Sequence, residues 1–186
     1  NGCRMAVDEV NAANPQLGGQ PVRFELLAED DQADPKTATV VAQKLVDSGV
    51  KGVVGHLNSG ASIPASRIYS DAGIAQISPA STAVAYTHQG FHTTFRLMAN
   101  DSQQGKALGE YATRLSKRVA VVDDRTAYGQ GLIDEVVKAV RTSGGDVVGR
   151  EFTTDKSTDF TAILTTLKGK RPDVLVFGGM DPQAAP

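Results

Sequence analysis

Apolar positions along the chain alternate between a helical and a strand-like spacing. Where they recur every three or four residues they predict amphipathic helices, over 5–13, 35–48, 59–69, 101–115, 132–143 and 160–167. Short apolar runs between these segments predict strands, over 22–28, 50–55, 73–77, 119–122, 147–148 and 174–177. Strands that alternate with helices in this way are typical of parallel βαβ units, with helices on both faces of the sheet. The predicted fold class is therefore α/β.

End signals and apolar stripes refine this prediction. Asp34 followed by Pro35 is typical of a helix start, and Asn100 or Asp101 is expected to cap a later helix. The stripes expected to face the core include Val40, Val41, Leu45 and Val46 in one helix, Leu108, Tyr111 and Leu115 in another, and Leu132, Val136, Val137 and Val140 in a third. The alternating series restarts near residues 95–100, which predicts a boundary between two lobes there.

Composition and charge narrow the class of protein. The chain has 186 residues, of which 40% are apolar and 22% are charged, and its formal net charge is −2. It has no dense Lys/Arg cluster, so we expect no nucleic-acid partner. Its longest apolar runs are far shorter than the roughly 20 residues that span a bilayer. Cys3 is the only cysteine, which excludes an intrachain disulfide and a thiolate metal cage.

The residues that follow the predicted strands are the candidates for a ligand site, because open α/β sheets bind ligands beyond the carboxyl ends of their strands. Loop 56–62, with Ser59 at its centre, leads into a helix N-terminus, which favours an anion. Loop 78–82 offers carbonyls for a cation and hydroxyls or N–H groups for an anion, from Ala80, Ser81 and Thr82. Together the two loops predict a site for the carboxylate and ammonium of a zwitterion. The alternative is that Ser59 and Thr82 merely cap helices.

Signatures of catalysis are weak in this sequence. It contains no GxxxxGK[ST] phosphate loop and no GxSxG elbow, and Gly129 and Gly131 lack the third glycine of a dinucleotide fingerprint. His56 precedes a candidate serine by a few positions, but we interpret it as a histidine at a strand end. We interpret His88 and His92 as a solvated loop pair, because no Glu-containing zincin motif surrounds them. The sequence therefore shows no reaction centre.

Several segments taken together resemble one family. The chain resembles the branched-chain amino-acid-binding proteins of bacterial ABC transporters in two segments, GHLNSGASIPAS at 55–66 and ISPAST at 77–82. Segments 30–36, 123–131 and 177–179 also resemble that family and follow in the expected order. The resemblance implies the type I periplasmic binding protein fold, with two Rossmann-like lobes whose parallel sheets are flanked by helices. It implies that residues 1–98 form the first lobe without its first strand, and that 99–186 form the opening part of the second. Because no leader segment precedes Asn1 and the chain closes just after a predicted strand, we expect both ends to be truncated.

The same resemblance implies roles for particular residues. Ser59 and Thr82 would bind the carboxylate of the ligand, and the Ala80 carbonyl and the Thr82 hydroxyl would receive its ammonium. Tyr128 would close over the ligand from the second lobe. Met180 stands where the leucine-type receptors carry an aromatic residue, so the side-chain specificity is left open.

The function implied is that of a non-enzymatic, periplasmic solute-binding receptor that delivers an amino acid, branched-chain or related, to an ABC permease in the membrane. We expect no cofactor and no metal. The family's cysteine pair is absent, and Ala33 and Asn58 stand at its positions. The alternatives left open are a receptor of the same fold for an amide, urea or an aromatic acid, the effector-binding domain of a regulator, and a Rossmann-type enzyme.

Overall fold

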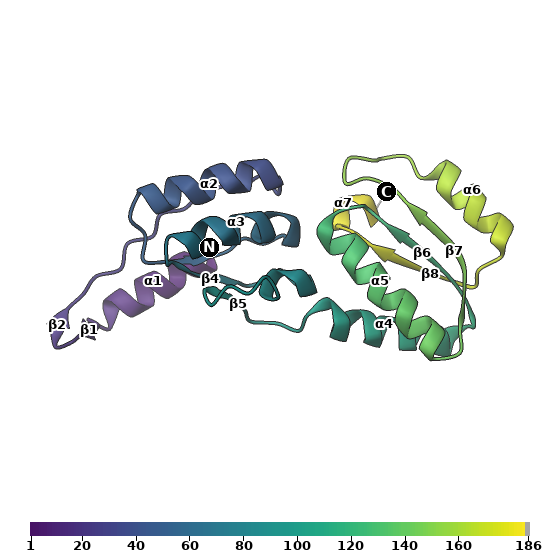
Figure 1. Ribbon diagram of the computed structural model, residues 1–186, viewed down its shortest axis with the longest axis horizontal. Coiled ribbons are helices and arrows are strands. Elements are labelled where there is room, and N and C mark those ends of the chain that lie inside the picture. Colours follow the sequence, from purple (N-terminus) through teal and green to yellow (C-terminus); the bar gives the residue numbers. More distant parts are fainter. Residues whose placement is uncertain (185–186) are drawn as a thin grey trace.

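The computed structural model of the protein describes residues 1–184. One parallel sheet has the order β3 (Gly52–Val54), β4 (Ala75–Ser78) and β5 (Thr94–Arg96). A second has the order β7 (Asp146–Phe152), β6 (Arg118–Asp123) and β8 (Val174–Gly178), and it is also parallel throughout. The two sheets lie in separate halves of the molecule, which the segment between β5 and the helix α4 (Asp101–Leu115) joins (Figure 1). The predicted α/β fold with parallel sheets is confirmed.

Helices flank both sheets, as predicted. The first half contains α1 (Gly2–Ala12), α2 (Pro35–Asp47), α3 (Ser59–Asp71) and the 3-10 helix η1 (Val84–Thr87), of which α1 has no buried residue. The second half contains α4, α5 (Ala127–Thr142), α6 (Thr161–Lys170) and the short α7 (Asp181–Ala184). A small antiparallel hairpin, formed by β1 (Gln16–Leu17) and β2 (Gln20–Pro21), follows α1.

The predicted helix starts are confirmed by their capping hydrogen bonds. The Asp34 side chain accepts a hydrogen bond of 2.7 Å from the Thr37 N–H, and Pro35 takes the first helical position of α2. Asn100 caps α4 in a capping box, in which the Gln103 side chain accepts a hydrogen bond from the Asn100 N–H. Each cap pairs backbone N–H groups that have no partner within the helix.

In the second half, alternate residues of the central strand β6 belong to two different core clusters, one on each face of the sheet. Val119 and Val121 of β6 pack against α5, while the intervening Ala120 and Val122 pack against Leu167 of α6. Because alternate side chains of a strand point to opposite faces, the two helices cover the two faces of the second sheet. The predicted stripe of α5 is confirmed, since its members are buried: Leu132, Val136, Val137 and Val140. A separate cluster joins α2, α3 and β3 in the first half, formed by Val41, Ala42, Leu45, Val53, Ala65, Tyr69 and Ile74.

The prediction of a strand over 22–28 is wrong. This segment is extended but pairs with no other strand in the described part of the chain. The backbone of Phe24 pairs instead with the Asn11 side chain, which donates to the Phe24 carbonyl and accepts from the Phe24 N–H, both at 2.8 Å. Phe24 and Leu27 are exposed. An apolar alternation predicts a strand only where a neighbouring strand completes the hydrogen-bond ladder.

The predicted stripe of α4 faces the wrong way, while that of α2 is confirmed at Val41 and Leu45, which are buried, and is wrong at Val40. Val40 of α2 is exposed, and in α4 Leu108 is 37% exposed and Tyr111 60% exposed. The reason in α4 is its close approach to α5 through glycine. A Cβ atom on Gly109 would lie 2.6 Å from the Ala139 Cβ, so this contact has no room for a leucine. Small residues therefore form the buried face of α4, and the large apolar residues lie on the outer one.

Candidate ligand-binding site

The carboxyl ends of the strands in both halves open onto one cavity of about 770 Å³. Its wall combines residues after β3 and β4 with residues after β6, β7 and β8, which is where open α/β sheets hold ligands. The first residues of α2, α3 and α5 also reach the wall, so the positive ends of three helix dipoles face it. The lining residues that the sequence singled out are Ala33, Asn58, Ser59, Ala80, Thr82, Tyr128 and Met180.

Ser59 lines the cavity and is 2% exposed. The N-cap of α3 is Asn58, which makes no side-chain cap, and Ser59 is the first residue of the helix. The Ser59 hydroxyl instead accepts a hydrogen bond of 3.1 Å from the Ala83 N–H. The alternative that Ser59 caps the helix is therefore wrong, because its hydroxyl joins two loops.

Thr82 does not cap a helix either. The short helix that follows begins at Val84 and has Ala83 at its N-cap position. The Thr82 hydroxyl oxygen is buried and has no hydrogen-bond partner among residues 1–184. Thr82 thus brings to the cavity wall a polar group that the fold itself does not use.

Ser81 is the one predicted site residue that does not line the cavity. It is fully buried, and its hydroxyl lies 2.6 Å from the Ser62 hydroxyl and donates to the Leu57 carbonyl at 3.0 Å. The hydroxyls of Ser62 and Ser78 both donate to the His56 carbonyl, at 3.1 Å and 2.6 Å. This network ties the loops after β3 and β4 into one rigid wall, and Ser81 belongs to it.

Arg96 holds the Thr82 loop from behind, a role that sequence reasoning missed. Its guanidinium donates to the carbonyls of Ser81 and Ala83, both at 2.9 Å, so both neighbours of Thr82 are fixed. It also donates to the Thr87 hydroxyl at 2.7 Å. Burial lowers the pKa of Arg96, and the charge of the nearby Asp101 opposes this effect. Arg96 ends β5, which has a single apolar residue, Phe95, and which the apolar pattern did not predict, so the sequence carried no signal for this contact.

The second half contributes Tyr128, held by the start of α5. Asp124 accepts hydrogen bonds from the Thr126 N–H at 2.9 Å and from the Thr126 hydroxyl at 2.6 Å. Thr126 in turn caps α5 by accepting from the Gly129 N–H at 3.0 Å. Burial raises the pKa of Tyr128, while the Gln104 side chain lowers it. Tyr128 therefore faces the cavity as a neutral phenol at neutral pH.

His56 has its ring engaged away from the cavity wall. Its Nδ1 lies 2.6 Å from an Asp31 carboxylate oxygen, and its Nε2 lies 3.2 Å from the Tyr69 hydroxyl. Neither ring nitrogen is bonded to the Ser59 hydroxyl, which agrees with our interpretation of His56 as a strand-end histidine. Within the described residues, no group of three or more His, Cys, Asp or Glu side chains is arranged to hold a metal ion. None of the helices over residues 1–184 has the length and apolarity needed to cross a membrane.

Comparison with known proteins supplies the family. The family model described as periplasmic binding protein matches residues 1–186. The chain belongs to this family. Its predicted resemblance to the branched-chain amino-acid-binding proteins is confirmed by the Leu/Ile/Val-binding protein homolog 1 of Brucella abortus. That protein is 40% identical over 185 residues, which make up 98% of this chain and 49% of the relative.

Solved structures confirm the type I periplasmic binding protein fold. A branched-chain amino acid transporter substrate-binding protein of Streptococcus pneumoniae, in complex with isoleucine, matches with a TM-score of 0.79 and 34% identity, over 94% of this chain and 50% of that one. A type 1 periplasmic binding protein of Bordetella pertussis shares the fold with a TM-score of 0.82 at 23% identity, over 92% of this chain and 48% of that one. The chain thus spans about half the length of the relatives that it matches.

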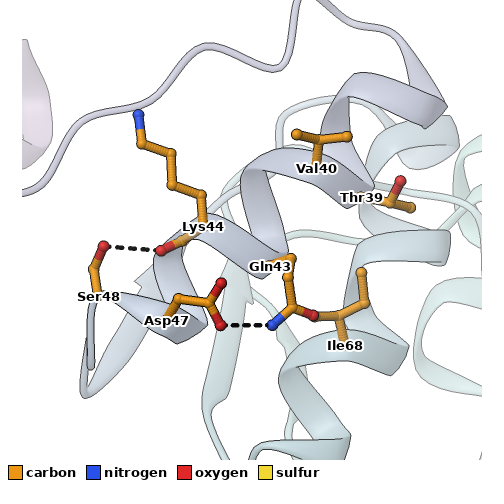
Figure 2. Close-up of a pocket in the computed structure, with 7 residues that line it drawn as sticks. All are labelled: Thr39, Val40, Gln43, Lys44, Asp47, Ser48 and Ile68. Atoms are coloured by element: carbon orange, nitrogen blue, oxygen red, sulfur yellow. Dashed lines mark hydrogen bonds between the residues drawn. The ribbon is translucent and has the colours of Figure 1, made fainter.

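A second hollow, of about 710 Å³, lies along α2 (Figure 2). Its polar groups bond to one another: the Gln43 amide donates to the Asp47 carboxylate and the Ser48 hydroxyl to the Lys44 carbonyl, both at 2.8 Å. No loop after a strand reaches it. It does not lie at the strand ends where open α/β sheets hold ligands, so the cavity between the two halves is the candidate site.

Proposed function

We propose that the protein is a solute-binding receptor of an ABC importer, and that it binds an amino acid, branched-chain or related, in the cavity between its halves. In this proposal residues 1–98 form the first lobe and 99–186 the opening part of the second. The observation that carries the proposal is the convergence of Ser59, Ala80 and Thr82 with Tyr128 and Met180 on one cavity. The names of the relatives, which include a Leu/Ile/Val-binding protein and a receptor solved with isoleucine, support the ligand class.

The first-lobe wall is suited to both charged ends of an amino acid. The ligand carboxylate binds at the start of α3, to Ser59 and to the Thr82 N–H, where the helix dipole favours an anion. The ammonium binds to the Ala80 carbonyl and the Thr82 hydroxyl. Hydrogen bonds to charged groups contribute about 1.5–3 kcal/mol each, so a few of them with an apolar side-chain pocket reach micromolar affinity, about −8 kcal/mol.

Ligand binding favours the closed form of the receptor because the ligand contacts residues of both lobes. A ligand held only by Ser59, Ala80 and Thr82 would bind equally well to the open and the closed molecule. It would therefore not shift the equilibrium between the two forms. Tyr128 and Met180 lie on the second-lobe side of the cavity, so they contact the ligand fully only when the lobes come together. The closed form is then the signal that an ABC permease in the membrane recognises, with the receptor itself in the periplasm. The receptor carries out no catalysis in this proposal.

A thermal-shift screen of the full-length protein tests the ligand class. The panel contains leucine, isoleucine, valine and other amino acids, together with amides, urea and aromatic acids. We expect stabilisation by the branched-chain amino acids, because a ligand that binds only the folded state raises the unfolding temperature. Stabilisation by an amide, urea or an aromatic acid, with none by any amino acid, would contradict the proposal and favour one of the other receptors of this fold.

A further inference from the structure

Asp101 is a buried carboxylate that the fold leaves without a partner. Its side chain is 1% exposed, and neither carboxylate oxygen makes a hydrogen bond to any residue of the described chain. Its backbone N–H donates to the Thr82 carbonyl at 2.8 Å, which fixes it directly behind the cavity wall. The Thr82 hydroxyl is equally buried and unpartnered within residues 1–184. Two polar groups without partners thus lie next to each other at the candidate site.

The carboxylate has no structural task that accounts for its burial. The start of α4 is already capped by Asn100 and Gln103, so the helix does not need the Asp101 side chain. The guanidinium of Arg96 donates to two carbonyls and a hydroxyl, and the Asp101 carboxylate accepts no hydrogen bond from it. Burying an unpaired charge is costly, and unpaired groups of this kind concentrate at functional sites.

We propose that Asp101 is a positioning residue: when the ligand binds, its carboxylate accepts the proton of the neighbouring Thr82 hydroxyl, so that the lone pairs of that oxygen face the ammonium of the ligand. This inference rests on the proposed function and adds the requirement that the ligand carry an α-ammonium. A hydroxyl has one proton to donate and two lone pairs, and an ammonium can only donate. With its proton directed to Asp101, the Thr82 oxygen is fixed as an acceptor.

The surroundings of Asp101 bear on whether its carboxylate is ionised when a ligand is bound. The charged or titratable groups around it are Arg96 of β5, with Glu135 and Tyr128 of α5. Burial raises the pKa of Asp101, while the nearby Thr82 hydroxyl and Arg96 lower it, so a cation arriving at Thr82 favours the ionised form.

The test compares L-leucine with 4-methylpentanoate, which has the same side chain and carboxylate but no ammonium. In the full-length protein, Asp101→Asn is expected to weaken leucine binding about tenfold or more, because Asn carries no charge and its NH₂ competes as a donor. The affinity for 4-methylpentanoate, measured by calorimetry at millimolar concentrations, is expected to stay within about twofold. The unfolding temperature is expected not to fall, since the substitution removes an unpaired buried charge.

Asp123→Asn is the matched control, because Asp123 is a buried carboxylate that pairs with Arg150 at 3.3 Å and does not line the cavity. It is expected to leave the preference for leucine over 4-methylpentanoate unchanged. An Asp101→Asn protein that keeps the wild-type preference would overturn the inference.

A double-mutant cycle keeps the inference falsifiable even if Asp101→Asn folds poorly. Thr82→Val removes the hydroxyl with little change in shape, and Asp101→Glu moves the carboxylate while keeping its charge. If Asp101 acts through Thr82, a change at Asp101 has a much smaller effect on leucine affinity in the Thr82→Val background. Additive effects would show that the two residues act independently and would refute the inference. If the wild-type protein binds no amino acid at all, the proposed function is itself wrong and the inference falls with it.

Discussion

Ser59 and Ala83 are joined by a hydrogen bond of 3.1 Å, which the Ala83 N–H donates to the Ser59 hydroxyl. Ser59 begins α3, and Ala83 ends the loop that follows β4. The bond therefore fixes the spacing of the two loops that carry Ser59 and Thr82. A ligand that needs both loops meets them already in position, so binding loses little free energy to ordering this wall.

Ser59→Ala is expected to weaken leucine binding by about 1–3 kcal/mol, because a charged ligand group loses a partner and the Ala83 N–H is left unpaired. Ser66→Ala is the control. Ser66 is a buried serine of the same helix whose hydroxyl donates to the Ile63 carbonyl at 2.7 Å, outside the cavity. Calorimetry is expected to show reduced affinity only for Ser59→Ala. Equal losses in the two variants would mean that Ser59 acts on stability and not on the ligand.

Tyr128→Ala is expected to reduce the ligand-induced compaction of the full-length protein, because Tyr128 supplies the contact from the second lobe. Small-angle scattering at saturating leucine measures this change in the radius of gyration. Tyr111→Ala serves as the control, since Tyr111 is an exposed tyrosine on the outer face of α4. Compaction in Tyr128→Ala equal to that of Ser59→Ala and of the wild type would argue against a role in closure.

Gly109→Ala is expected to destabilise the protein by about 1–3 kcal/mol, since an added methyl overpacks a tight helix contact. The new Cβ would lie 2.6 Å from the Ala139 Cβ and 2.7 Å from the Val136 carbonyl oxygen. Gly169→Ala in α6 is the matched control. Nothing lies within 4 Å of a Cβ placed there, so this change is expected to stabilise by about 0.5–1 kcal/mol through helix propensity. Urea unfolding that gives both variants the same stability would contradict the packing described for α4 and α5.

The pH dependence of stability is expected to carry the signature of Asp101. Burial raises its folded-state pKa above the ordinary value of 3.8, so between these two values the folded state binds more protons than the unfolded state. The stability that Asp101 contributes is therefore fully present below pH 3.8 and is lost as the pH rises through the raised pKa. Asp101→Asn lacks this loss, so its advantage over the wild type in urea unfolding is expected to grow as the pH rises above the ordinary value of 3.8. Parallel curves for the two proteins would show that Asp101 titrates normally.

The fold was predictable wherever the apolar pattern and the local end signals agreed. The α5 stripe of Leu132, Val136 and Val140, and the caps at Asp34 and Asn100, depend on contacts close in sequence or on one strongly apolar face. The failures depended on partners that are distant in sequence. The segment 22–28 lacked a neighbouring strand, and the stripe of α4 was reversed by the approach of α5 to its glycines.

The candidate site was predictable to the level of loops but not of individual contacts. Residues after β3 and β4 of one sheet, and after β6, β7 and β8 of the other, reach the cavity because parallel strands end at the same edge of their sheet. The direction of the Ser81 side chain, and the contacts of Arg96 and Asp101 behind Thr82, depend on the exact turn after β4. No spacing along the sequence distinguishes a serine on the wall from a serine behind it.

A crystal structure of the full-length protein grown with L-leucine tests the central claim most directly. We expect leucine in the cavity between the halves, with its carboxylate at Ser59 and the Thr82 N–H and its ammonium at the Ala80 carbonyl and the Thr82 hydroxyl. Tyr128 is expected to contact the ligand from the other side. Leucine bound along α2 or elsewhere on the surface, or bound with its ammonium directed away from Ala80 and Thr82, would contradict it.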